Sequence, residues 1–85
     1  MLMKTGEQTL ANLKQGQRAV IEAVDAETAE VQRLMTLGLV EGAEVELASK
    51  ALGGDPLEFR LFGRGISLRK EQARRFRIAA AGDRE

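Results

Sequence analysis

Residues 43–68 read AEVELASKALGGDPLEFRLFGRGISL, and this stretch decides the fold. Apolar residues alternate with polar ones over 43–47 and again over 57–61, which is typical of strands that bury one face. The loop GGDP at 53–56 separates these two strands, and GRG at 63–65 is expected to form a tight hairpin turn before the next strand. The stretch therefore predicts three consecutive short strands.

Upstream of this stretch, the pattern predicts one strand and one helix. Residues 18–24 are rich in β-branched side chains and are expected to form a strand. A helix is expected over 25–39, with apolar residues at i, i+3 and i+4 and with Asp25 as the N-cap. We expect Gly38 to end this helix, because glycine adopts the positive φ of the C′ position at no steric cost.

Short elements are expected on either side. Residues 9–13 place two leucines three positions apart, as in a single helical turn. A short turn at 70–73 leads into a last strand around 76–78. Residues 1–7 and 80–85 are expected to be loose tails.

Five strands with one buried face do not form a stable flat sheet, because the apolar face would have no partner. Closure into a strongly bent barrel covers that face and removes the edges. The sequence thus predicts an all-β fold, an SH3-like barrel of about five strands with one α-helix inserted after the first strand. We expect residues 1–85 to form a single domain with its core in about 8–78.

The composition of the 85 residues restricts the chemistry. The chain has no cysteine and no histidine, so it lacks thiolate nucleophiles, imidazole bases and the usual zinc ligands. We therefore expect a binding module and not an enzyme. No apolar run is long enough to span a bilayer, so no membrane insertion is expected. Without a secretory signal pattern, a cytoplasmic location is the default expectation.

Charge is balanced overall and divided along the chain. Residues 1–47 hold eight acids and four bases, whereas residues 48–85 hold nine bases and five acids. A net charge of zero makes nonspecific nucleic-acid binding an unexpected main function. A basic patch is still predicted in the second half, from Arg60, Arg64, Arg69, Lys70, Arg74, Arg75 and Arg77.

Four motifs in order carry a resemblance to a known family. They are Leu10-x-x-Leu13-x-x-Gly16, Arg33-Leu34-x-x-Leu37-Gly38-Leu39-x-x-Gly42, Gly54-Asp55-Pro56-Leu57, and Gly63 followed by Ile66-x-Leu68-Arg69-x-x-x-Ala73. Together they resemble the ferrous iron transport protein A (FeoA) family, small cytosolic SH3-like partners of the membrane iron transporter FeoB. The resemblance implies a non-enzymatic adaptor or regulator of ferrous iron uptake that binds the cytosolic part of FeoB.

Two alternatives from other classes stay open. The same barrel resembles the C-terminal domain of iron-dependent repressors, which would make the chain a regulatory module. A basic-faced nucleic-acid-binding barrel is the third reading, and a steep dependence of DNA or RNA affinity on salt would favour it. The oligomeric state is not indicated by the sequence.

We expect the partner-binding residues to form one apolar patch rimmed by two arginines. The predicted patch consists of Leu37, Leu39 and Leu52, with Arg33 and Arg64 at its rim. Leu52 and Phe62 are the apolar side chains expected outside the barrel. Three glycines are assigned structural roles, namely Gly38, Gly42 and Gly63.

No cofactor and no physiological metal site is expected. Only carboxylates are present as ligands for a divalent cation, and exposed carboxylate pairs are usually solvated surface. Glu27 and Glu30, expected on one helix face, are at most a weak, adventitious cation site.

Overall fold

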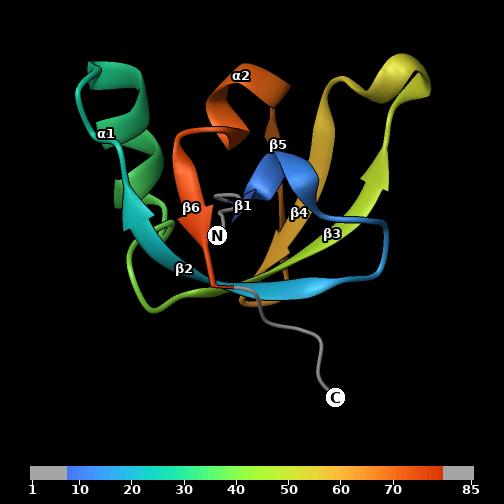
Figure 1. Ribbon diagram of the computed structural model, residues 1–85, viewed down its shortest axis with the longest axis horizontal. Helices are drawn as coiled ribbons and strands as arrows, with labels where there is room; N and C mark the ends of the chain where they lie inside the picture. The colour runs from blue at the N-terminus through green and yellow to red at the C-terminus, as the bar shows by residue number, and fades with distance from the viewer. Residues whose placement is uncertain (1–7, 80–85) are drawn as a thin grey trace, which may run out of the picture.

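The computed structural model describes residues 8–79, which form one six-stranded antiparallel sheet with short helices at its margins (Figure 1). The loose tails predicted at 1–7 and 80–85 lie outside the described residues. The elements are, with η for a 3-10 turn, β1 Gln8–Thr9, η1 Leu10–Asn12, β2 Arg18–Val24, α1 Ala29–Thr36, β3 Glu44–Lys50, η2 Leu52–Gly54, β4 Leu57–Leu61, β5 Arg64–Leu68, α2 Lys70–Ala73 and β6 Phe76–Ile78.

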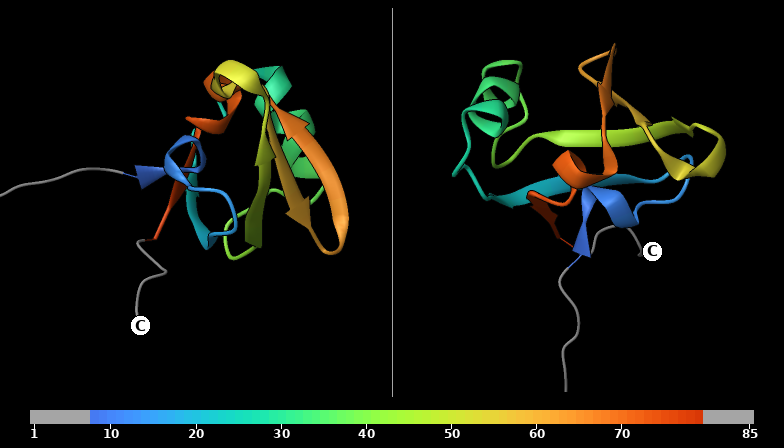
Figure 2. Two further views of the ribbon diagram at one scale, coloured as in Figure 1. Left: turned by 90° about the vertical axis from the view of Figure 1, so that its right-hand side faces the viewer. Right: turned by 90° about the horizontal axis from the view of Figure 1, so that it is seen from above.

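The strand order is β1-β6-β2-β3-β4-β5, and β2 pairs with a different neighbour in each of its halves. Residues 18–20 of β2 pair with β3, whereas residues 21–24 pair with β6. Register shifts in the β2–β6 and β3–β4 pairs add local twist, as β-bulges do. The sheet therefore curls on itself (Figure 2), which gives the predicted SH3-like fold.

The alternation of apolar and polar residues along β3 and β4 was predicted correctly. Val45 and Leu47 are fully buried, and so is Phe59 on the neighbouring strand. The large side chains of the core come from η1, from strands β2 to β6 and from the connection between α1 and β3. The largest fully buried ones are Phe59, Phe76, Leu10, Ile21, Leu39, Leu47, Leu57, Leu61, Leu68 and Val45.

The strand count differs slightly from the prediction. The short strand β1 precedes the first predicted strand in the chain and pairs with β6. Helix α1 therefore follows the second strand in the chain and not the first. Two residues are too few to show a period-two pattern, which is why the sequence did not reveal β1.

No helix within residues 8–79 is both long and apolar enough to cross a membrane.

The predicted start of the helix is wrong. Helix α1 begins at Ala29, and its N-cap is Thr28, whose Oγ1 accepts a hydrogen bond from the backbone N–H of Val31 at 3.2 Å. Asp25 instead extends the pairing of β2 with β6, since its backbone N–H donates to the carbonyl of Arg75 at 2.8 Å. Its carboxylate also accepts from the Arg75 guanidinium at 3.0 Å. Pairing between strands thus overrides a local capping preference.

The predicted turn of the last hairpin is shifted by one residue. Leu61 pairs with Arg64, so the two-residue turn is Phe62-Gly63, and Gly65 lies inside β5. Both turn residues have positive φ, 53° at Phe62 and 80° at Gly63, as in a type I′ turn. Gly63 has the structural role that was predicted, whereas Phe62 is a turn residue and not the end of a strand.

Candidate partner-binding surface

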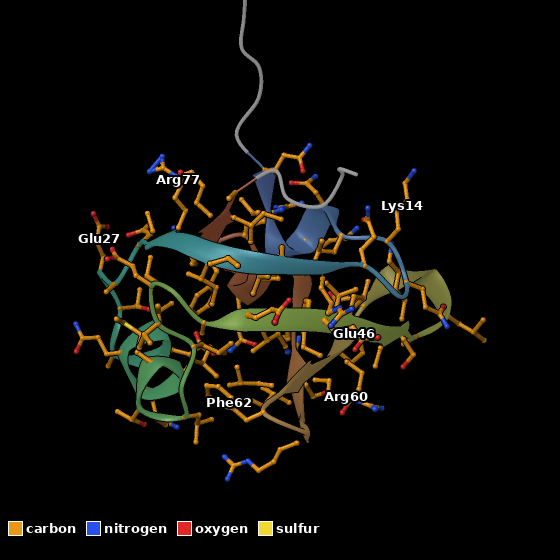
Figure 3. All side chains as sticks on the ribbon, turned by 90° about the horizontal axis from the view of Figure 1, so that it is seen from below. Lys14, Glu27, Glu46, Arg60, Phe62 and Arg77 are labelled. Atoms are coloured by element: carbon orange, nitrogen blue, oxygen red, sulfur yellow. The ribbon has the colours of Figure 1, made fainter. Side chains whose placement is uncertain are left out.

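Large apolar side chains that remain exposed gather at the C-terminal end of α1. The exposed fractions are 44% for Leu37, 38% for Val40 and 76% for Phe62. The ring of Phe62 lies over Gly38, because a Cβ added at Gly38 would be 3.2 Å from the ring. Figure 3 shows Phe62 at the tip of the β4–β5 hairpin, on the side that faces α1. We call Leu37, Val40 and Phe62 the hairpin surface.

Gly38 brings the two parts of this surface together, and its predicted role at the helix end is confirmed. Its φ is 113°, and its N–H donates to Met35 while that of Leu39 donates to Leu34, the hydrogen bonds of a Schellman motif. A Cβ here would also lie 3.1 Å from Leu61, so the missing side chain leaves room for the hairpin. The helix therefore ends where the β4–β5 hairpin packs.

Gly42 also has the predicted structural role. Its φ is 91°, and its N–H donates to the carbonyl of Ile21 at 2.8 Å as the chain turns into β3. The connection from α1 to β3 is thereby tied to β2, and the position of Val40 in this connection is fixed.

Phe62 occupies a backbone conformation that is unfavourable for its residue type. Among residues 8–79 it is the one non-glycine residue with positive φ. Left-handed backbone costs an L-residue roughly 1–2 kcal/mol, and bulky side chains rarely adopt it. Asparagine or aspartate tolerates this position of a type I′ turn much better. The sequence thus keeps a bulky, exposed aromatic ring at a position where the fold favours a small polar residue.

The two arginines predicted for the rim lie next to the hairpin surface along the chain. Arg64 follows the turn directly, and Arg33 precedes Leu37 by four residues on the last turns of α1. Both arginines are exposed. The apolar centre therefore has positive charge at its margin.

Two members of the predicted patch do not belong to this surface. Leu39 is fully buried, because it packs back into the core after the helix ends, and it cannot contact a partner. Leu52 is 99% exposed in η2, at the far end of the β3–β4 hairpin from α1 (Figure 1). Of the three predicted patch residues, Leu37 is exposed at the hairpin surface, whereas Leu39 belongs to the core and Leu52 to a separate region.

The structure adds Val40 and Phe62 to the candidate site. The sequence identified Phe62 as exposed, yet its place beside α1 depends on the pairing register of β4 and β5. Val40 had no distinguishing signal, because its exposure follows from the Schellman motif that turns Leu39 inward.

The carboxylates considered for a cation do not share a helix face. Glu27 precedes α1, whereas Glu30 lies in its first turn and accepts a hydrogen bond from the side-chain amide of Gln72. Within residues 8–79 no group of three or more potential metal ligands of the His, Cys, Asp or Glu type occurs. The helix boundary thus separates a pair that the sequence had placed together.

Part of the predicted basic patch surrounds a hollow of about 280 Å³ beside α2 and β6. Arg74, Arg75 and Arg77 line it together with Asp25, which pairs with Arg75. Figure 3 shows Arg77 and Phe62 on opposite sides of the molecule. This hollow is therefore separate from the hairpin surface.

Residues 8–79 match the model of the FeoA domain, which covers most of the chain. This protein belongs to the FeoA family. No match was found among curated proteins. The family assignment agrees with the resemblance carried by the four sequence motifs.

Solved structures of FeoA proteins are similar to this chain in both sequence and fold. A FeoA protein from Chlorobium tepidum is 38% identical, with a TM-score of 0.79, over 91% of this chain and 74% of that one. FeoA from Stenotrophomonas maltophilia, solved with zinc, is 36% identical, with a TM-score of 0.79, over 87% of this chain and 92% of that one. It is described as a prokaryotic SH3 domain protein.

A FeoA-like protein from Clostridium acetobutylicum is 26% identical, with a TM-score of 0.83, over 96% of this chain and 95% of that one. The repressor IdeR from T. acidophilum, at 19% identity and a TM-score of 0.73, is similar in fold alone over 92% of this chain and 36% of its own length. The FeoA proteins and the repressor domain therefore share one fold, and the match to the FeoA domain model assigns this chain to the FeoA family.

Proposed function

We propose that this protein is a non-enzymatic accessory protein of ferrous iron uptake, an adaptor that binds the cytosolic part of the membrane iron transporter FeoB. The observation that carries the proposal is the match of residues 8–79 to the FeoA domain. For the S. maltophilia relative, a role as a bacterial ferrous iron transport activating factor has been suggested. The adaptor acts in the cytoplasm.

The hairpin surface supports binding in place of catalysis. Exposed leucine, valine and phenylalanine side chains with arginines at their margin form a typical arrangement of apolar anchors and charged rim. The full sequence supplies neither histidine nor cysteine for the commonest forms of acid–base or nucleophilic chemistry. The chemistry of the exposed side chains therefore fits a protein partner.

Two measurements test the proposal. Calorimetric titration of the purified protein into the cytosolic domain of the FeoB transporter from the same genome should give a saturable 1:1 isotherm. Deletion of the gene should lower uptake of radiolabelled ferrous iron, and a plasmid copy should restore it. Gln15→Ala, at an exposed turn away from the hairpin surface, is the control variant and should behave as wild type. Absence of binding together with unchanged uptake in the deletion strain would refute the proposal.

A further inference from the structure

Phe62 carries two independent costs that a residue selected for folding alone would avoid. Its backbone has a φ of 53°, and 76% of its surface is exposed to water. Strained backbone conformations of this kind are concentrated at functional sites, where the surrounding structure holds them in place. An asparagine at position 62 would relieve the strain and remove the exposed ring. The presence of phenylalanine therefore points to a role outside the fold.

The ring is already positioned before any partner arrives. The type I′ turn fixes its backbone, and Gly38 leaves the space in which one edge of the ring rests, 3.2 Å from where a Cβ would lie. An aromatic side chain has only two χ angles, so little conformational entropy remains to be lost when it is bound. Phe62 is thus a rigid, protruding apolar group.

We propose that Phe62 is the central anchor of the interface and inserts into an apolar pocket with an acidic rim on the partner. The rim is inferred from charge complementarity, because two exposed arginines, Arg33 and Arg64, lie next to the surface along the chain and outnumber the one exposed acid there, Glu41. The partner is identified with the transporter only through the proposed function, on which this inference rests.

Phe62→Asn tests the inference because it separates folding from binding. Asparagine followed by glycine is the preferred sequence of a type I′ turn, so the midpoint of urea denaturation should rise. The affinity for the cytosolic domain of the transporter should fall at least about tenfold, as for an interface hot spot. Phe62→Tyr, which keeps the ring, should change the affinity less than about threefold. Leu52→Asn is the matched control at an exposed apolar position outside the hairpin surface and should bind as wild type.

Each outcome decides something different. If Phe62→Asn binds as tightly as wild type, the anchor is refuted while the proposed function stands. A lower denaturation midpoint for Phe62→Asn would also refute the inference, because the phenylalanine would then be retained for the fold. If the wild type does not bind the transporter domain but Phe62→Asn lowers iron uptake in cells, the anchor stands and the proposed partner is wrong. If iron uptake is the same in the wild type, the deletion strain and the Phe62→Asn strain, both the proposed function and the anchor role of Phe62 are refuted.

Discussion

The two ends of β4 each present a large apolar side chain to solvent, but they do so at different costs. Before β4, Leu52 is 99% exposed in a loop whose positive φ angles, 83° and 86°, fall on Gly53 and Gly54. After β4, Phe62 itself carries the positive φ, and its ring packs on Gly38. Glycines thus provide the unusual backbone at one end, whereas at the other end an aromatic residue does.

Exposure alone would rank Leu52 above Phe62 as a binding residue. Single exposed apolar residues are common on protein surfaces and need no functional explanation. A strained, pre-positioned ring beside two further exposed apolar side chains is much harder to explain by chance. The strained Phe62 is therefore a stronger candidate for binding than the more exposed Leu52.

The largest expected effect is on stability, and it differs between a glycine at the Phe62 end of β4, Gly38, and a glycine at the Leu52 end, Gly53. Gly38→Ala should lower the free energy of unfolding by about 2–4 kcal/mol, because strain at positive φ adds to contacts of 3.1–3.2 Å with Leu61 and Phe62. Gly53→Ala should cost about 1 kcal/mol, since it has the strain but no described atom lies within 4 Å of the new Cβ. Urea denaturation of both variants measures the difference. Equal losses would mean that the hairpin does not pack tightly on the helix end.

The second effect concerns binding by the neighbours of Phe62. Leu37→Ser/Val40→Ser should weaken binding to the transporter domain about tenfold, because apolar contact around an anchor excludes water from it. Leu52→Ser should change the affinity less than about twofold, as for a residue outside the interface. Calorimetry gives both values, and circular dichroism checks that the variants fold. Loss of binding only in Leu52→Ser would move the interface to the other end of β4.

Much of the fold could be predicted because it depends on local patterns. The alternation at 43–47 and 57–61 determines which faces are buried, and Gly38 determines where the helix ends. The helix start could not be predicted, because Asp25 and Thr28 are both good N-caps and only the pairing of β2 with β6 decides between them. The local sequence offers two possible N-caps, and the strand pairing of Asp25 leaves Thr28 as the one that is used.

The candidate site was predictable only in part. Arg33, Arg64 and Leu37 are exposed, so they remain available for the predicted role at the surface. Leu39 was misplaced in the patch although it follows the glycine that was predicted to end the helix, because the residue after the glycine of a Schellman motif turns inward. Which exposed residues share a surface depends on tertiary packing, and so neither the separation of Leu52 nor the approach of Phe62 to α1 could be inferred.

The smallest expected effect concerns the charges at the margin of each region. Arg33→Ala/Arg64→Ala should reduce the affinity about threefold at low salt, mainly by slowing association, because rim charges steer encounter more than they hold the complex. The matched control Lys50→Ala/Arg69→Ala removes two exposed cations near η2, since Lys50 ends β3 and Arg69 lines a hollow with Asp55 and Pro56, and it should leave the association rate unchanged. Stopped-flow measurements at several salt concentrations distinguish the two pairs.

The salt dependence makes this test independent of folding defects. The wild type should lose association rate as ionic strength rises, because the screening length shortens from about 10 Å at 0.1 M to about 3 Å at 1 M. The Arg33→Ala/Arg64→Ala variant should show a shallower slope, so that its rate converges with that of the wild type at high salt. A defect in folding would instead lower its rate by the same factor at every salt concentration. If the association rate of the Lys50→Ala/Arg69→Ala variant has the shallower dependence on salt, the partner approaches the Leu52 end of β4. The binding surface would then lie at that end and not at the Phe62 end.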